Sequence, residues 1–162
     1  MKLTNRIAIV GHAADKFTPM TEGVARATIE EIFLARPVEQ NILISGGCHL
    51  GGIDIFAEDC AKGLGIECEI YLPVRHTWSG GYKERNLQIA ESCDEAWCIV
   101  VNDYPPDYAL PKFGNGKCYH CRDARPPHVK SGGCWTLKQA ARLDKPTHWV
   151  IIDAHSLEAT LV

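Results

Sequence analysis

The chain has 162 residues, of which 46% are hydrophobic and 23% are charged, as in an ordinary single globular domain. This composition excludes intrinsic disorder, collagen-like repeats and a continuous coiled coil. The formal net charge of −3 excludes nucleic-acid binding by overall positive charge, although a local basic patch remains compatible with it.

Apolar runs alternate with amphipathic segments along the chain. Short apolar runs predict strands at residues 6–10, 41–45, 67–73, 96–101 and 147–153. Apolar residues at helical spacing predict helices at residues 21–35, 53–64, 82–92 and 136–143. This order predicts an α/β fold: one domain over residues 1–162, with an open parallel sheet of about five strands and helices on both faces.

The apolar run at residues 7–10 is too short for a signal peptide or a membrane span. We therefore expect a cytoplasmic protein that has no membrane partner. Four of the eight cysteines lie in apolar segments, where a reduced cysteine packs as a small hydrophobe: Cys60, Cys68, Cys93 and Cys98. The other four lie in glycine-rich or loop-like sequence, where chemistry is expected: Cys48, Cys118, Cys121 and Cys134.

The carboxyl ends of the predicted strands carry the unusual residues, and ligands bind at such ends in open parallel sheets. The first strand leads into Gly11 and His12, and the second leads into Ser45-Gly46-Gly47. A second such turn, Ser131-Gly132-Gly133, precedes Thr136 in the last helix. Two Ser-Gly-Gly turns suit a phosphate held by backbone amides, and the alternative is that the glycines only make tight turns.

Charged side chains follow these turns. Asp54 and Glu58 lie one turn apart on a predicted helix and are candidates for acting on a ribose or polarising water. The alternative is that Asp54 stabilises the helix N-terminus and Glu58 faces solvent. Arg85, next to Asn86, suits a phosphate because its planar fork donates two hydrogen bonds, and the alternative is an ordinary surface arginine.

Aromatic side chains add further candidates near this crevice. Trp78 either stacks on a base or covers the core. His12 and His49 are expected at the crevice mouth, as hydrogen-bonding walls or as general bases. The chain has neither the Walker lysine pattern nor a Gly-x-Gly-x-x-Gly motif. The sequence therefore lacks the motifs that would most strongly indicate ATP hydrolysis or NAD chemistry.

Several of these motifs together resemble a known family. They are Ser45-Gly46-Gly47 with Gly52, Asp54, Ala57, Glu58, Ala61 and Gly65; Tyr71-Leu72-Pro73; Arg85-Asn86 with Ala90 and Asp94-Glu95-Ala96; and Ser131-Gly132-Gly133-x-x-Thr136 with Ala140 and Lys145-Pro146. The pattern resembles the SLOG superfamily, Rossmann-like nucleotide-binding domains related to the DNA-processing protein DprA and to the Lonely Guy phosphoribohydrolases. The resemblance spans nearly the whole chain and implies a cleft for a nucleotide or a nucleotide-derived molecule.

The chain departs from the family pattern at two places. Cys48-His49-Leu50 and an extra glycine lengthen the loop before Asp54. The last turn lacks the Pro-Gly-Gly-x-Gly-Thr-x-x-Glu pattern of the phosphoribohydrolases and has no acid in the matching place. The known catalysis of the family therefore does not transfer to this chain.

Residues 102–130 form a proline-rich insertion that has no apolar period and carries a cysteine and histidine pattern. Cys118, Cys121, His128 and Cys134 have the spacing Cys-x2-Cys-x6-His-x5-Cys, which predicts a structural Zn²⁺ site. Free cysteines or a disulfide are the alternative, and His120 is the alternative fourth ligand.

The insertion also carries basic residues, which are Lys112, Lys117, Arg122, Arg125 and Lys130. We expect the protein to bind a nucleotide or nucleotide derivative as a sensing or carrier module. The competing hypothesis is an enzyme that hydrolyses or transfers an N-glycosidic or phosphoribosyl bond. A weaker one is a nucleic-acid-binding accessory protein that uses the basic insertion. Among possible partners, a second copy of the same chain, forming a homo-oligomer, also stays open.

Overall fold

The computed structural model describes residues 3–110, 118 and 132–162, and a six-stranded sheet lies at its centre. The strand order is β3-β2-β1-β4-β5-β6. The bounds are β1 (Asn5–Gly11), β2 (Asn41–Ser45), β3 (Glu67–Ile70), β4 (Glu95–Val101), β5 (Thr147–Ile152) and β6 (Ala159–Leu161). The first five strands are parallel, and β6 pairs antiparallel with β5.

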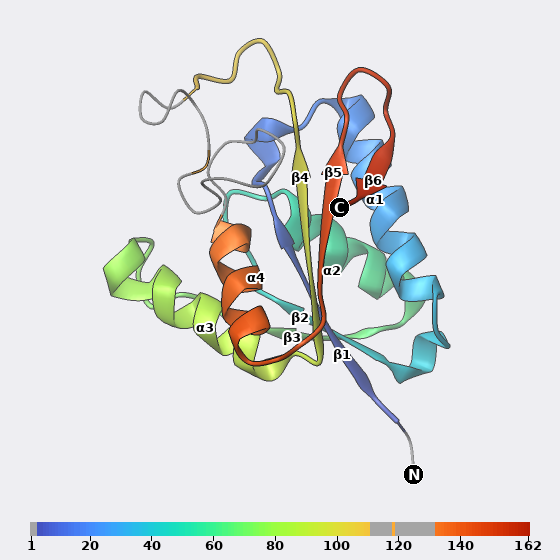
Figure 1. The fold of residues 1–162 in the computed structure, drawn as a ribbon, viewed down its shortest axis with the longest axis vertical. Coiled ribbons are helices and arrows are strands. Elements are labelled where there is room, and N and C mark those ends of the chain that lie inside the picture. Colours follow the sequence, from blue (N-terminus) through green and yellow to red (C-terminus); the bar gives the residue numbers. More distant parts are fainter. Residues whose placement is uncertain (1–2, 111–117, 119–131) are drawn as a thin grey trace.

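Helices cover both faces of this sheet, as predicted (Figure 1). One face carries α1 (Pro19–Leu34) and α2 (Ile53–Leu64), and the other carries α3 (Lys83–Ser92) and α4 (Gly132–Arg142). Shorter elements are the 3-10 turns η1 (Ala14–Lys16) and η2 (Val38–Gln40) and a π-helical turn, η3 (Trp78–Tyr82). The chain therefore has a Rossmann-like α/β fold.

Alternation along the strands builds two separate cores. Ile7 and Ile9 of β1 pack against α1 and α2, whereas Ala8 and Val10 pack against α3 and α4. All four side chains are buried, so β1 reads as a continuous apolar run rather than as an alternating one. This explains why the strands were predictable from short uninterrupted apolar segments.

The direction of strand addition reverses between β1 and β4. From β1 the chain adds β2 and β3 on one side, then returns through α3 to place β4 on the other side of β1. The helices that follow β1 and β4, which are α1 and α4, therefore lie on opposite faces of the sheet. In open α/β sheets this divergence leaves a crevice for ligands.

Parts of the secondary structure differ from the prediction. The sixth strand, β6, was not predicted, because it has three exposed residues and no buried apolar run. Helix α4 begins at Gly132 rather than at Thr136, so the second pair of glycines lies in its first turn. Within the described ranges, no helix combines the length and the apolar character needed to cross a membrane.

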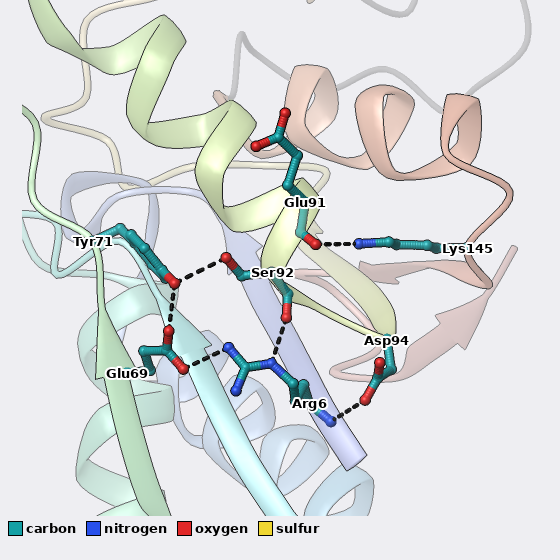
Figure 2. A network of polar contacts seen from close by, with 7 residues as sticks. All are labelled: Arg6, Glu69, Tyr71, Glu91, Ser92, Asp94 and Lys145. Carbon is teal, nitrogen blue, oxygen red and sulfur yellow. Dashed lines mark hydrogen bonds and ion pairs between the residues drawn. The ribbon is translucent and has the colours of Figure 1, made fainter. Parts of the chain in front are cut away.

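A polar network ties the amino-terminal end of β1 to β3 and to the end of α3 (Figure 2). Arg6 donates to Glu69 and to the backbone carbonyl of Ser92, and Tyr71 bonds to both Glu69 and Ser92. Lys145 donates to the carbonyl groups of Ala90 and Glu91 near the same helix end. These bonds hold the carboxyl end of α3 and thereby help to orient the helix that carries Arg85 and Asn86.

Candidate functional site

A cleft of about 340 Å³ opens at the carboxyl end of β1, where the strand order reverses. Its lining residues come from the segments that follow β1, β2 and β3 and from the first turn of α4. The predicted site residues among them are Gly11, His12, Asp54, Trp78, Arg85, Asn86, Gly132, Gly133 and Thr136. The described fold thus brings nine of the predicted residues to one cleft.

Arg85 and Asn86 are buried in the wall of the cleft, with 7% and 5% of their surface exposed. Arg85 donates from Nη1 to the carbonyl of Gly46 and from Nε to Asn86 Oδ1, at 2.8 Å for the latter. Because Oδ1 accepts this bond, the Nδ2 amide group of Asn86 is the donor that lies toward Gly132. The interpretation of Arg85 as an ordinary surface arginine is therefore wrong.

Asp54 and Glu58 are both buried on α2, and they have different surroundings. Asp54 lines the cleft and accepts a bond from the Cys48 N–H at 3.2 Å. Burial raises the pKa of the Asp54 carboxyl to about 6, although the Arg85 guanidinium and the Cys48 N–H oppose this rise. Glu58 accepts from Ser45 Oγ at 2.7 Å, so a solvent-facing Glu58 is excluded.

The first Ser-Gly-Gly turn is engaged within the protein. Gly47 N–H donates to Ser45 Oγ at 3.3 Å, and the Gly46 carbonyl accepts from Arg85. A Cβ at Gly46 would lie 2.6 Å from Arg85 Nη1, so the glycine makes room for the guanidinium. Ser45, Gly46, Gly47 and Glu58 are not among the described residues that line the 340 Å³ cleft.

The second glycine pair, Gly132 and Gly133, also lines the cleft. A Cβ at Gly133 would lie 2.9 Å from the backbone nitrogen of Gly11, so this glycine lets α4 pack against β1. Gly132 has more room: a Cβ there would have a single neighbour within 4 Å among the described residues, Asn86 Nδ2 at 3.4 Å. Since the helix dipole favours an anion at this end, the first turn of α4 with Asn86 is a candidate anion-binding corner. Thr136 Oγ1 donates to the Gly132 carbonyl at 3.1 Å.

His12 is 1% exposed and lies at the end of β1. The Val101 N–H donates to His12 Nδ1 at 3.1 Å, so Nδ1 is the acceptor and the neutral ring carries its proton on Nε2. In this tautomer His12 is a hydrogen-bond donor rather than a general base. Its carbonyl accepts from Ile53 N–H, and a Cβ at Gly52 would lie 2.3 Å from that carbonyl oxygen. Gly52, with φ of +88°, is therefore required for α2 to begin against β1.

Several cleft residues escaped the sequence analysis, because they belong to no recognisable motif. They are Lys16, His76, Thr77 and Tyr82. The π-helical turn places Tyr82 and Trp78 at the cleft, and π-helical turns are frequent at functional sites. The sequence did contain one signal that could have identified His76 and Tyr82 as cleft residues. His76, Trp78 and Tyr82 place three planar rings close together in the sequence just before Arg85.

Trp78 and His49 have ring partners. Trp78 packs edge-to-face on Trp135, with ring centroids 5.1 Å apart, and lines the cleft. His49 stacks on His76 with centroids 3.9 Å apart and planes at 6°. His76 in turn lies 6.0 Å from Tyr82, with planes at 14°. Of these three nearly parallel rings, His76 and Tyr82 line the cleft, whereas His49 is not among its described lining residues.

Two of the predicted zinc ligands lie together. Cys118 and Cys134 are buried, and their sulfur atoms are 3.8 Å apart. Cys121, His128 and the alternative ligand His120 lie outside the described residues, as does Ser131. Among the residues that are described, no group of three or more His, Cys, Asp or Glu side chains is arranged to hold a metal ion.

Comparison with known proteins gives a structural neighbour. No protein-family model matches the chain, and no curated protein matches it in sequence. The molybdenum cofactor carrier protein of Chlamydomonas reinhardtii is similar in structure, with a TM-score of 0.56 and 17% sequence identity. The match covers 90% of this chain and 76% of that one. At this identity the likeness establishes the Rossmann-like fold.

Proposed function

We propose that this protein binds a phosphate-bearing nucleotide or nucleotide derivative in the cleft at the end of β1, as a carrier or sensing module. The observation that carries the proposal is the gathering of donors around one 340 Å³ space. Arg85, Asn86 Nδ2, Lys16 and the first turn of α4 all offer positive charge or hydrogen-bond donors there. Such a set suits a phosphate group.

The residues around these donors suit the base of a nucleotide. Planar rings, Trp78 and Tyr82 among them, border the same cleft and offer stacking surfaces for a base. A carrier role accords with the structural neighbour, which is itself a carrier of a small molecule, the molybdenum cofactor. The nucleotide part of the proposal rests on the cleft residues and on the SLOG resemblance of the motifs.

Titration with AMP tests the proposal. Arg85→Lys keeps the charge and loses the planar fork, so we expect AMP to bind about tenfold more weakly than to the wild type. Arg26→Lys is the matched control, because Arg26 pairs with Glu22 and Asp59 on α1 and α2 and is not among the described cleft residues. If no nucleoside monophosphate raises the melting temperature at millimolar concentration, the proposal is wrong.

A second candidate function is cleavage of an N-glycosidic or phosphoribosyl bond. It is favoured by Asp54, whose buried carboxyl lines the cleft and has a pKa of about 6, suited to proton transfer near neutral pH. Incubation with nucleoside monophosphates and analysis of the products separates it from simple binding. Release of free base by the wild type, and not by Asp54→Asn, would favour the enzyme.

We further propose that Cys118, Cys121, His128 and Cys134 hold a structural zinc ion. Two thiolates on one tetrahedral zinc, each with a bond of about 2.3 Å, lie about 3.8 Å apart. The sulfur atoms of Cys118 and Cys134 have this separation. The basic residues of the insertion lie outside the described residues, so the nucleic-acid hypothesis stays a prediction.

Elemental analysis tests the zinc proposal. Protein made under reducing, zinc-replete conditions should carry about one zinc per chain. Cys134→Ser should lower this content, whereas Cys60→Ser, a half-buried cysteine in α2, should leave it unchanged. Zinc-free wild-type protein, or a Cys118–Cys121 disulfide in it, would overturn the proposal.

A further inference from the structure

A second compartment, of about 250 Å³, adjoins the cleft on the side of β3. It is lined by residues that follow β2 and β3, among them Gly47, Leu72 and Pro73. Four residues border both spaces: Cys48, His76, Tyr82 and Arg85. The two spaces therefore lie side by side and share these residues as a common wall.

The chemistry of the second compartment differs from that of the first. Its lining combines the planar rings of His49, His76 and Tyr82 with the apolar side chains of Leu72 and Pro73. His49 and His76 stack face to face, the His76 ring is nearly parallel to that of Tyr82, and Leu72 is 67% exposed. Planar rings with aliphatic neighbours suit an aromatic ring rather than a phosphate.

Arg85 is the cationic residue among the four that border both spaces. Its guanidinium is anchored by Gly46 and Asn86 and lies 5.4 Å from the centre of the Tyr82 ring. A second phosphate at this position would lie between the anion-binding corner at α4 and the ring-lined compartment. The fixed cation also disfavours a positively charged ring beside it, so a neutral ring fits better.

We propose that the ligand carries two ring-bearing groups joined through phosphates, with its second, neutral ring bound among Leu72, Pro73, His76 and Tyr82. This inference rests on the proposed nucleotide binding and specifies its ligand as a dinucleotide-type molecule. The first nucleotide occupies the larger cleft, the linking phosphates lie at Arg85, and the second ring stacks in the smaller compartment.

Two matched probes test the inference. ADP-ribose and diadenosine diphosphate share an adenosine diphosphate esterified to a ribose, and only the latter has a second adenine. Since stacking of one base on aromatic side chains commonly contributes a factor of about ten or more, we expect the wild type to bind diadenosine diphosphate about tenfold more tightly. Isothermal titration of both probes gives the ratio directly.

Leu72→Trp places a larger side chain in the second compartment and should abolish the preference for diadenosine diphosphate. Because Leu72 is exposed, folding is not at risk. Leu161→Trp is the control, since this residue on β6 is 62% exposed and borders neither space. It should keep the wild-type ratio.

The outcomes separate the two proposals. Equal affinity of the wild type for both probes, or an unchanged preference in Leu72→Trp, overturns the second-ring inference and leaves nucleotide binding intact. If neither the two probes nor AMP binds the wild type at millimolar concentration, both proposals fail together. A preference lost only in Leu72→Trp supports the inference.

Discussion

Asp54 and Arg85 place two buried charged side chains on the walls of one cleft. The guanidinium is held by the Gly46 carbonyl and by Asn86, so its direction is set before any ligand binds. A fixed cation of this kind loses little conformational entropy when it meets a phosphate. Burial of Asp54 raises its pKa, which means that the protein holds a carboxyl partly protonated near neutral pH.

Replacement of Asp54 by Asn should change how stability depends on pH. The folded-state pKa of about 6 lies above the ordinary 3.8, so the stabilisation linked to Asp54 is complete below pH 3.8 and is lost as the pH rises through 6. The loss is at most about 3 kcal/mol. Asp54→Asn cannot ionise, so its free energy of unfolding should rise relative to the wild type between about pH 4 and 7.

Urea unfolding of both proteins at a series of pH values measures this difference. A control variant is Asp59→Asn on the same helix, because Asp59 pairs with Arg26 and is half exposed. Parallel curves for the wild type and Asp54→Asn would show that the buried carboxyl has an ordinary pKa.

Helix α4 is the element on which the anion-binding corner depends. Its two glycines have different tasks, since Gly133 lets the helix approach Gly11 of β1 and Gly132 borders the cleft. Both were predicted as ligand contacts, because a Ser-Gly-Gly turn before a helix has the same sequence in either role. Only the packing of α4 on β1 separates them.

Alanine substitutions should separate the two tasks. Gly133→Ala puts a Cβ 2.9 Å from a backbone nitrogen, and we expect it to destabilise the protein by about 1–3 kcal/mol. Gly132→Ala meets a neighbour only at 3.4 Å, so stability should be kept while AMP binds about tenfold more weakly, because the methyl group occupies the anion's space. Thermal unfolding and AMP titration of both variants are the measurements. Unchanged AMP affinity in Gly132→Ala would remove α4 from the site.

At the scale of the whole molecule, the sheet extends to both sides of β1, and polar contacts tie the amino-terminal end of β1 to β3 and to the end of α3 (Figure 2). Arg6 of β1 reaches Glu69 on β3 and Ser92 at the end of α3, and thereby spans the neighbouring strand β2. Bonds from Tyr71, then from Arg6, lower the pKa of Glu69 despite opposing desolvation. The network therefore favours the ionised form of Glu69.

Arg6→Leu should lower the melting temperature at pH 7, since it removes the contacts to Glu69 and Ser92. Because the folded-state pKa of Glu69 is lowered, its stabilising effect is present above about 4.5 and is lost as the pH falls further. The difference between wild type and variant should therefore shrink in acid. Calorimetric scans at pH 7 and pH 3 test this. An equal difference at both would show that the ion pair with Glu69 does not contribute, and would assign the effect to the Ser92 bond and to packing of the Arg6 side chain.

Local pattern was sufficient for the order of the main elements. Buried strands such as β1 and β4 are uninterrupted apolar runs, and their alternation with amphipathic helices implies a parallel sheet. Because the carboxyl ends of parallel strands lie on one edge, the positions of His12, Asp54 and Gly132 near a common cleft also followed from chain order.

The tertiary structure alone decided what each side chain does in that cleft. Arg85 stands in a charged stretch, Lys83-Glu84-Arg85, that has the composition of a surface, and only the approach of the loop after β2 buries it. Lys16, His76 and Tyr82 come from segments without a motif, and β6 is too short and exposed to have a period. The sequence by itself determined the periodic elements and their edge of the sheet, because those depend on neighbours along the chain. Burial, hydrogen-bond partners and the second compartment depend on contacts between distant segments, which no local pattern encodes.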